Sequence, residues 1–262
     1  MNEYTILNKD ITHGNLCKMT FLAPDMAKTA CAGQFLHIRP NESTAPLLRR
    51  PISIHDADKT IGTVTILFKM PGNGTKLIAE KNAGERLDIL GPLGNGYRFP
   101  DTGTILLIGV GIGLAPLLFA GRQAQEKGLK VIFSPGTGSA KKMLPYSAFE
   151  QFSETILPFS KDGSIGTKAY ADDMIENILS DTKLDCIYTC GPEAMMKQVA
   201  KTAANHGINC QVSIEERMGC GVGACMTCVC ATKKSDGNIG HSRVCHDGPV
   251  FNSKEVFFDE LG

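Results

Sequence analysis

The sequence predicts an α+β multidomain protein: an antiparallel β-barrel over residues 1–100, a parallel α/β domain over 101–210 and a small C-terminal domain over 211–262. Short apolar runs separated by glycine and proline turns fill the first part, a pattern typical of a closed antiparallel barrel. Continuous apolar runs that alternate with helical stretches fill the second part and predict a parallel sheet. Five of the ten cysteines lie between Cys220 and Cys245, in a segment too short to build a good core alone. A bound metal is therefore expected to help fold the third part.

Four short apolar runs are the expected barrel strands, and each is bounded by turn residues. They are Gly33–Ile38, Pro51–Ile54, Val64–Phe68 and Leu87–Leu90. The third run stops at the turn Pro71–Gly74, after which Thr75–Lys81 fits a single helix. The fourth runs into Gly91–Gly94, which would close the barrel segment.

Three apolar runs in the second part are the expected strands of the parallel sheet, namely Thr104–Ile108, Lys130–Phe133 and Asp185–Thr189. A glycine-rich turn and a helix ending near Lys127 follow the first of them. A helix over Glu193–His206 follows the third. This alternation of strands and helices is the pattern of a parallel α/β sheet.

Composition excludes several classes of partner. The 27 basic and 27 acidic residues give a formal net charge of +0, so no long-range attraction to nucleic acid or anionic lipid is expected. The longest apolar stretch, Ile105–Ala120, is broken by glycines and is too short to span a bilayer. The first residues lack the order of a signal peptide, so a cytoplasmic location with reduced cysteines is expected.

The clustered cysteines have the spacing C-x4-C-x2-C followed by one distant cysteine, which is the plant-type [2Fe–2S] pattern. Two bridged irons need four thiolates, so the expected metal ligands are Cys220, Cys225, Cys228 and Cys245. The interleaved Gly219, Gly221 and Gly223 let a loop wrap the cluster and bring backbone N–H groups close to sulfur.

A zinc site is the alternative for these cysteines, because Cys225-x2-Cys228 alone would fit zinc. A second such pair is missing, and the glycines favour a cluster loop. Cys230 is expected to be a buried cysteine that binds no metal.

The string Arg50-Pro51-Ile52-Ser53 resembles the Arg-x-x-Ser motif of the ferredoxin–NADP reductase superfamily. The resemblance implies bound FAD, with Arg50 on the pyrophosphate and Ser53 beside the reactive edge of the flavin. A guanidinium suits the phosphate role because it binds oxygens in a bidentate manner. Ile52 stands where the family has tyrosine, and a strand start with a surface arginine is the alternative interpretation.

A second flavin-binding element follows at the distance the superfamily shows. It comprises Leu67, Phe68 and Lys69 and then Gly74 and Thr75. In the family such a Gly-Thr opens a helix whose N-terminus faces the pyrophosphate, which is favourable for an anion.

A nucleotide-binding loop is expected at Gly109, Gly111 and Gly113, which follow a buried strand and open a helix. The form G-x-G-x-G-x-x-P resembles the same superfamily, and an ordinary strand–helix turn is the alternative. Cys190, Gly191 and Pro192 resemble the family's second nicotinamide element, against the alternative of a core thiol at a strand end. No acidic residue follows the second strand, so NAD and NADP are not distinguished. The segment 134–142 offers hydroxyls and two lysines to a 2′-phosphate instead.

The order of barrel, nucleotide domain and C-terminal cluster loop is similar to that of the electron-transfer subunits of dihydroorotate dehydrogenase B. Residues 216–225 and 243–251 carry most of the resemblance. It implies FAD, a [2Fe–2S] cluster, NAD as a substrate and an FMN-containing dihydroorotate dehydrogenase catalytic subunit, in a heterotetramer of two plus two chains. Electrons would pass from FMN through the cluster and FAD to NAD⁺, in the synthesis of UMP.

Dihydroorotate itself is not expected to react on this chain, because an FMN barrel takes about 250 residues and no room remains for one. No catalytic side chain is predicted, since no nucleophile–base pair stands out. The small flavin and iron–sulfur subunit of a ferredoxin:NADP oxidoreductase or a sulfur reductase complex has the same three-part order and is an alternative. A zinc-stabilised interaction module is the alternative outside the enzymes.

Overall fold

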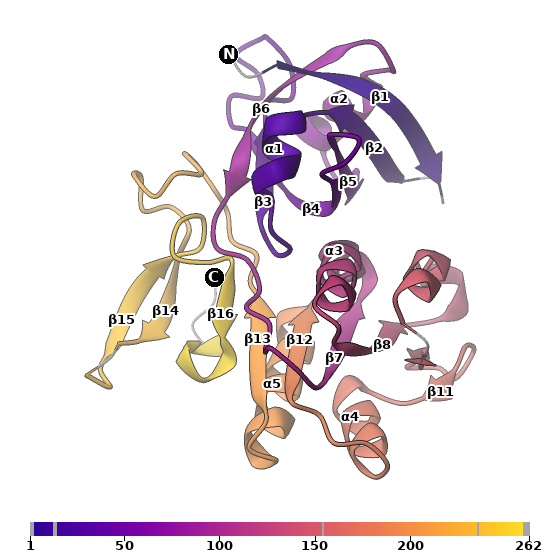
Figure 1. Ribbon diagram of the computed structural model, residues 1–262. Coiled ribbons are helices and arrows are strands. Elements are labelled where there is room, and N and C mark those ends of the chain that lie inside the picture. Colours follow the sequence, from indigo (N-terminus) through magenta and orange to yellow (C-terminus); the bar gives the residue numbers. More distant parts are fainter. Residues whose placement is uncertain (1–2, 13–14, 154, 235, 259–262) are drawn as a thin grey trace.

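The computed structural model describes residues 3–12, 15–153, 155–234 and 236–258. Six antiparallel strands close a barrel in the order β1-β2-β5-β4-β3-β6 (Figure 1). They are β1 (Glu3–Thr12), β2 (Leu16–Leu22), β3 (Phe35–Ile38), β4 (Arg50–Asp58), β5 (Thr63–Lys69) and β6 (Arg86–Leu93), with the helices α1 (Pro24–Thr29) and α2 (Asn73–Glu80) between them. Strand alternation turns Ile52 and Ile54 into the barrel core and leaves Pro51 and Ser53 on its outer face.

A second sheet follows in the order β11-β10-β8-β7-β12-β13-β16, with β9 beside β8. Its parallel members are β7 (Thr104–Val110), β8 (Lys130–Thr137), β9 (Thr155–Ile156), β10 (Phe159–Ser160), β11 (Thr167–Lys168), β12 (Cys186–Cys190) and β13 (Asn209–Ser213). The helices are α3 (Leu114–Glu126), α4 (Ala171–Leu179) and α5 (Glu193–Asn205). The predicted fold class is confirmed.

Helices cover both faces of this sheet, and the alternation of β7 shows how. Ile105 and Leu107 belong to the core that contains α3 and the barrel. Leu106 and Ile108 belong to the core that contains α4 and α5. A strand buried on both faces has a continuous apolar sequence, which is why the run Thr104–Ile108 predicted strand β7.

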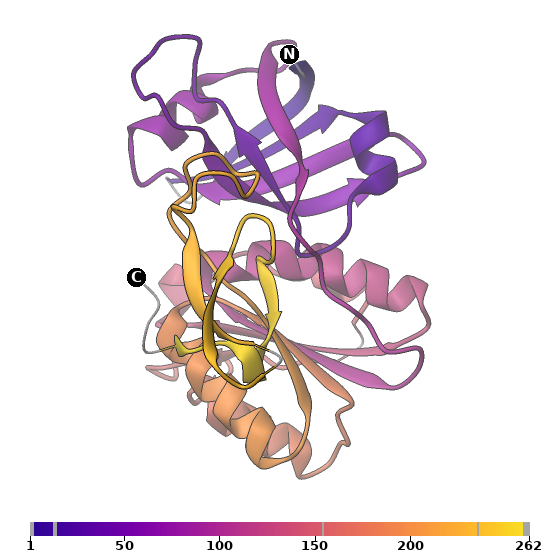
Figure 2. The ribbon, with the colours of Figure 1, turned by 90° about the vertical axis from the view of Figure 1, so that its left-hand side faces the viewer.

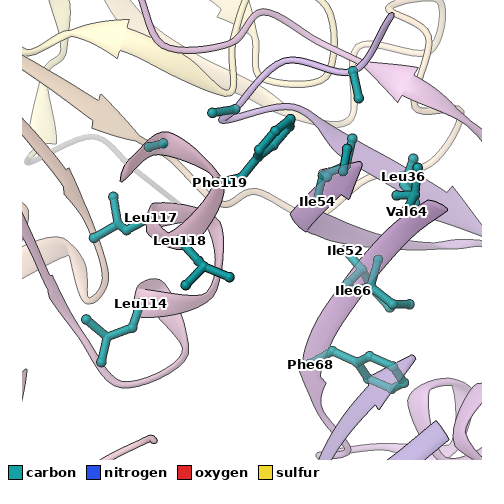
Figure 3. Close-up of a cluster of buried hydrophobic side chains, with 14 of the residues drawn as sticks. Leu36, Ile52, Ile54, Val64, Ile66, Phe68, Leu114, Leu117, Leu118 and Phe119 are labelled. Carbon is teal, nitrogen blue, oxygen red and sulfur yellow. The ribbon is translucent and has the colours of Figure 1, made fainter. Parts of the chain in front are cut away.

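The barrel and helix α3 share one continuous core. Figure 3 shows Phe119 of α3 pointing toward the barrel strand that carries Ile54. Two polar contacts reinforce this junction: His55 Nδ1 lies 2.6 Å from the carbonyl oxygen of Ala115, and Asp56 pairs with Arg122. Strand β4, which carries the Arg-x-x-Ser motif, is thereby fixed to the first helix of the nucleotide domain.

The C-terminal segment forms a hairpin of β14 (Val229–Lys233) and β15 (Ile239–Arg243) and then returns as β16 (Val250–Asn252). Strand β16 adds to the large sheet antiparallel to β13, so the predicted limit at residue 210 falls inside a strand that pairs with this segment. Figure 2 shows the segment lying along both the barrel and the sheet. Asn95, in the chain between the two domains, donates its backbone N–H to Gly248 at 2.5 Å.

Several elements differ from the sequence-based expectation in their limits. Helix α2 begins at Asn73 rather than Thr75, and β8 continues to Thr137 rather than ending at Phe133. No helix in the described ranges has both the length and the apolar character needed to cross a membrane.

Candidate functional site

The four predicted metal ligands lie together, and backbone N–H groups surround their sulfurs. Cys220 Sγ accepts from the N–H groups of Val222 and Ala224, at 3.5 and 3.3 Å. Cys245 Sγ accepts from Gly223 at 3.1 Å. Such contacts favour the thiolate form that binds metal. Gly221 and Gly223 have φ of +74° and +81°, a left-handed conformation that glycine adopts without strain.

The four thiols form two pairs. The N–H of Cys220 donates to Cys225 Sγ at 3.4 Å, and the N–H of Cys245 donates to Cys228 Sγ at 3.4 Å. Each pair also interacts through its side chains. Two pairs of thiols match the requirement of two irons for two thiolates each. In the part of the chain that the structure describes, no three or more Cys, His, Asp or Glu side chains are grouped tightly enough to hold a single metal ion.

The two pairs differ in burial. Hydrogen bonding by the Thr227 hydroxyl, 3.1 Å from Cys225 Sγ, and by nearby backbone lowers the pKa of exposed Cys225 to about 6. Burial raises the pKa of Cys245 to about 12, and the neighbouring Cys228 thiol adds to the effect. A bound metal would offset the raised pKa of Cys245, since a metal that binds the thiolate displaces the proton.

An ion pair clamps the segment of the fourth ligand to the loop of the first three. Arg243 binds Asp247 through Nε and Nη2, each at 3.0 Å, and donates through Nη1 to the carbonyl oxygen of Gly223 at 3.0 Å. The arginine holds the pKa of Asp247 well below its usual range. The sequence did not identify this pair, although Arg243 lies in the segment that carried the family resemblance.

The predicted flavin-binding elements meet at the start of α2. A Cβ on Gly74 would lie 2.4 Å from Arg50 Nε, so a side chain there would move the guanidinium away from this helical turn. A guanidinium beside a free helix N-terminus suits a pyrophosphate. Thr75 Oγ1 donates to the carbonyl oxygen of Gly72 at 3.0 Å and holds the turn.

The remaining predicted flavin residues flank this point. Pro51 and Ser53 are half-buried on the outer face of β4, whereas Ile52 is buried in the barrel. The position where the family has tyrosine thus points inward, which explains why an aliphatic residue suits it. Leu67 and Phe68 are largely buried in β5, and Lys69 at its end is exposed.

The predicted nucleotide elements also meet, because β7 and β12 are adjacent parallel strands and Gly109 pairs with Cys190. A Cβ on Gly113 would lie 2.3 Å from the Cys190 carbonyl oxygen, so the two loops touch backbone to backbone. Gly111 faces Lys69, whose Nζ would lie 4.0 Å from a Cβ there. The flavin and nucleotide elements therefore share one junction. Burial raises the pKa of Cys190 to about 12, so this residue is a neutral thiol.

The segment 134–142 has buried hydroxyls in its first half and exposed lysines at its end. Ser134 and Thr137 are buried within β8 and bond to the carbonyl oxygens of Leu157 and Ser139. Lys141 and Lys142 are exposed.

One site residue escaped the sequence interpretation entirely. His37 of β3 is fully buried, and a Cβ on Gly221 would lie 2.4 Å from its Nδ1. Burial and the nearby Arg49 charge lower the pKa of His37 to about 4, so its imidazole is neutral. A histidine in a short apolar run carries no signal of its own, because its environment comes from the distant cluster loop.

The barrel, the adjoining parallel sheet and the C-terminal segment with its grouped cysteines define a flavin reductase fold carrying an iron–sulfur segment. Residues 215–257 match the family model described as the iron–sulfur cluster binding domain of dihydroorotate dehydrogenase B. A dihydroorotate dehydrogenase B (NAD(+)) electron transfer subunit from Desulforamulus reducens is 37% identical over 247 residues, 94% of either chain. Its counterpart in Bacillus pumilus is 38% identical over 254 residues, 96% of this chain and 95% of that one. The chain belongs to the family of dihydroorotate dehydrogenase B electron transfer subunits.

A solved structure has the same fold. A chain of the NADH-dependent reduced ferredoxin-NADP oxidoreductase superimposes with a TM-score of 0.88 at 28% identity, over 100% of this chain and 92% of that one. The resemblance that the sequence indicated is confirmed.

Proposed function

We propose that this chain passes electrons from the FMN of a dihydroorotate-oxidising partner through a [2Fe–2S] cluster and FAD to NAD⁺, in the synthesis of UMP. The partner is a separate catalytic subunit, and the assembly contains two chains of each kind. The observation that carries the proposal is the contact of Gly221, in the loop of the first three cysteines, with His37 of barrel strand β3, next to the strand that bears Arg50 and Ser53.

The chain's own residues act by binding and orientation. Cys220, Cys225, Cys228 and Cys245 hold the cluster. Arg50 and the start of α2, with Gly74 and Thr75, hold the flavin pyrophosphate. Pro51, Ser53, Leu67, Phe68 and Lys69 shape the flavin site, and Ile52 supports their strand from inside the barrel. Gly109, Gly111, Gly113, Cys190, Gly191 and Pro192 receive the nicotinamide nucleotide. When bound, the flavin exchanges a hydride with nicotinamide and single electrons with the cluster.

The partner is expected to dock beside Cys225. This cysteine is exposed, and its neighbours Val222 and Met226 are each 52% exposed although apolar. Exposed apolar residues around a redox ligand suit an interface that brings two cofactors close together. Ten free cysteines fit a reducing compartment, and we place the protein in the cytoplasm.

Copurification with the FMN subunit and an assay of dihydroorotate with NAD⁺ tests the proposal. Cys225→Ala should abolish dihydroorotate-driven NAD⁺ reduction while NADH oxidation by a dye acceptor continues in part. Cys31→Ala is the matched control, because Cys31 is also an exposed free cysteine but lies in the barrel segment. Equal loss of both activities in Cys225→Ala contradicts the order of carriers. A [2Fe–2S] cluster requires iron and acid-labile sulfide in equal amounts. A purified protein that lacks either, or holds them in unequal amounts, contradicts the proposed cluster.

The alternative, the small subunit of a ferredoxin:NADP oxidoreductase, rests on the shared fold alone, because the relatives at 37% and 38% identity are dihydroorotate dehydrogenase B electron transfer subunits. The same assay separates the two, because that enzyme would reduce NADP⁺ with ferredoxin and leave dihydroorotate unchanged.

A further inference from the structure

His37 lies between the two predicted cofactor sites. On the antiparallel ladder of β3 and β4 it stands opposite Pro51, and Phe35 stands opposite Ser53. Directly opposed residues project to the same face of a sheet. His37 therefore shares the outer face of the barrel with the two outward residues of the flavin motif.

The opposite side of the imidazole meets the cluster loop. The α-carbon of Gly221 packs so closely that any Cβ would lie 2.4 Å from Nδ1 and 3.0 Å from the next ring carbon. The backbone groups of Cys220 and Arg49 also face the ring. Strand β3 is fixed in turn, because Arg49 donates to the carbonyl oxygen of His37 at 3.3 Å and pairs with Asp88 at 2.7 Å.

Neither ring nitrogen of His37 makes a hydrogen bond of good geometry within the described residues, although the side chain is 0% exposed and the backbone of Cys220 and Arg49 lies against the ring. Leaving a buried polar group unpaired costs roughly 1–3 kcal/mol, so such groups are rare and call for an explanation. The groups nearest to the ring belong to the loop that must close around the cluster. The backbone of that loop is therefore the group placed to hydrogen-bond the imidazole.

We propose that His37 is a positioning residue for electron transfer between flavin and cluster: in the loaded protein its imidazole hydrogen-bonds the backbone of loop 219–225 and holds Cys220 against the flavin face of the barrel. The inference rests on the proposed function. It adds a polar link outside the four thiols, and groups that orient metal ligands in this way affect affinity or activity about 10–100-fold when removed.

The test uses the protein loaded with FAD and cluster. His37→Phe keeps a ring but removes both nitrogens, and His37→Gln restores a polar side chain. His241→Phe is the control, since His241 is an exposed histidine in the hairpin next to the cluster loop. After rapid mixing with NADH, flavin bleaching should keep its wild-type rate in all variants. Cluster reduction should slow by about 10-fold or more in His37→Phe only, with partial recovery in His37→Gln.

A spectroscopic readout separates positioning from general support of the fold. The electron paramagnetic resonance line shape of the dithionite-reduced cluster should change in His37→Phe and stay near wild type in the other two variants. Wild-type rate and line shape in His37→Phe overturn the inference. Equal loss of cluster iron in His37→Phe and His37→Gln also overturns it, because side-chain polarity would then be irrelevant. Failure of NADH to reduce the cluster in the unmodified protein contradicts the proposed function instead.

Discussion

Asp56 on β4 and Arg122 on α3 form an ion pair in which Oδ2 and Nη2 are 2.7 Å apart, across the junction of barrel and nucleotide domain. Both side chains are partly buried, with 19% and 31% of their surface exposed. Burial raises the pKa of Asp56 although Arg122 opposes the shift. Desolvation thus outweighs the attraction, so the pair contributes to orientation more than to net stability.

Removing one partner of this ion pair should lower the free energy of unfolding more than removing both partners. Arg122→Met leaves a partly buried carboxylate unpaired and should lower the free energy of unfolding by about 1–3 kcal/mol. Asp56→Asn combined with Arg122→Met should recover part of that loss. Urea unfolding of both variants measures the difference, and a double variant less stable than Arg122→Met would contradict this view.

Gly74→Ala should weaken FAD binding without unfolding the barrel. The new Cβ would lie 2.4 Å from Arg50 Nε and displace the guanidinium from the start of α2. Loss of a charged hydrogen bond is worth about 1.5–3 kcal/mol, so the dissociation constant should rise about tenfold or more. Flavin fluorescence titration of the FAD-free protein measures it.

Gly72→Ala is the matched control for that variant, because nothing lies within 4 Å of a Cβ at Gly72 and its φ is −141°. Similar FAD affinity in the two variants would contradict the proposed role of Arg50 in binding the pyrophosphate.

Gly223→Ala should lower the cluster content. Its φ is +81°, its Cβ would lie 2.9 Å from His246 Cβ, and its N–H bonds Cys245 Sγ. Gly237→Ala is the control: its φ is +85°, but only Lys233 lies near, at 3.9 Å. Both changes carry a left-handed strain of roughly 1–2 kcal/mol. Iron and sulfide analysis should find a loss of cluster in Gly223→Ala alone. An equal loss of cluster in both variants would mean that backbone strain, and not the contact with Cys245, causes the effect.

Stability should fall as the pH drops from about 6.5 toward 4, because two histidines are held neutral in the fold. Burial lowers the pKa of His55 to about 4, so the unfolded chain binds more protons in this window. His55 should account for about 1 kcal/mol of the decrease between pH 7.5 and 5.5. His37 adds a loss of the same sign.

Denaturant unfolding of His55→Asn at the two pH values checks this, since the variant should lose part of the pH dependence. An unchanged dependence in His55→Asn would mean that this imidazole titrates normally.

Local motifs were predictable from the sequence because their chemistry resides in consecutive residues. The cysteine spacing indicated three thiols on one loop and a fourth on a separate segment, and in the structure Cys220 contacts Cys225 while Cys245 contacts Cys228. The flavin and nucleotide strings likewise fall at strand ends next to helix starts. Their roles as ligands stay predictions.

Contacts between distant segments were not predictable. His37 and Gly221 meet only because β3 and the cluster loop fold against each other, and neither residue signals the other. The ion pair of Asp56 with Arg122 is hidden for the same reason. Strand β16 was missed because three residues are too few to show the alternation of buried and exposed side chains. It forms a strand because it pairs with β13.

The pairing of β16 with β13 means that the cluster-binding tail is not a detachable cassette. Cutting the chain after the nucleotide domain would expose an unprotected strand edge, where other molecules could add and aggregate. A graft of this redox centre onto another reductase therefore needs a sheet edge in the recipient protein that pairs with β16 as β13 does here.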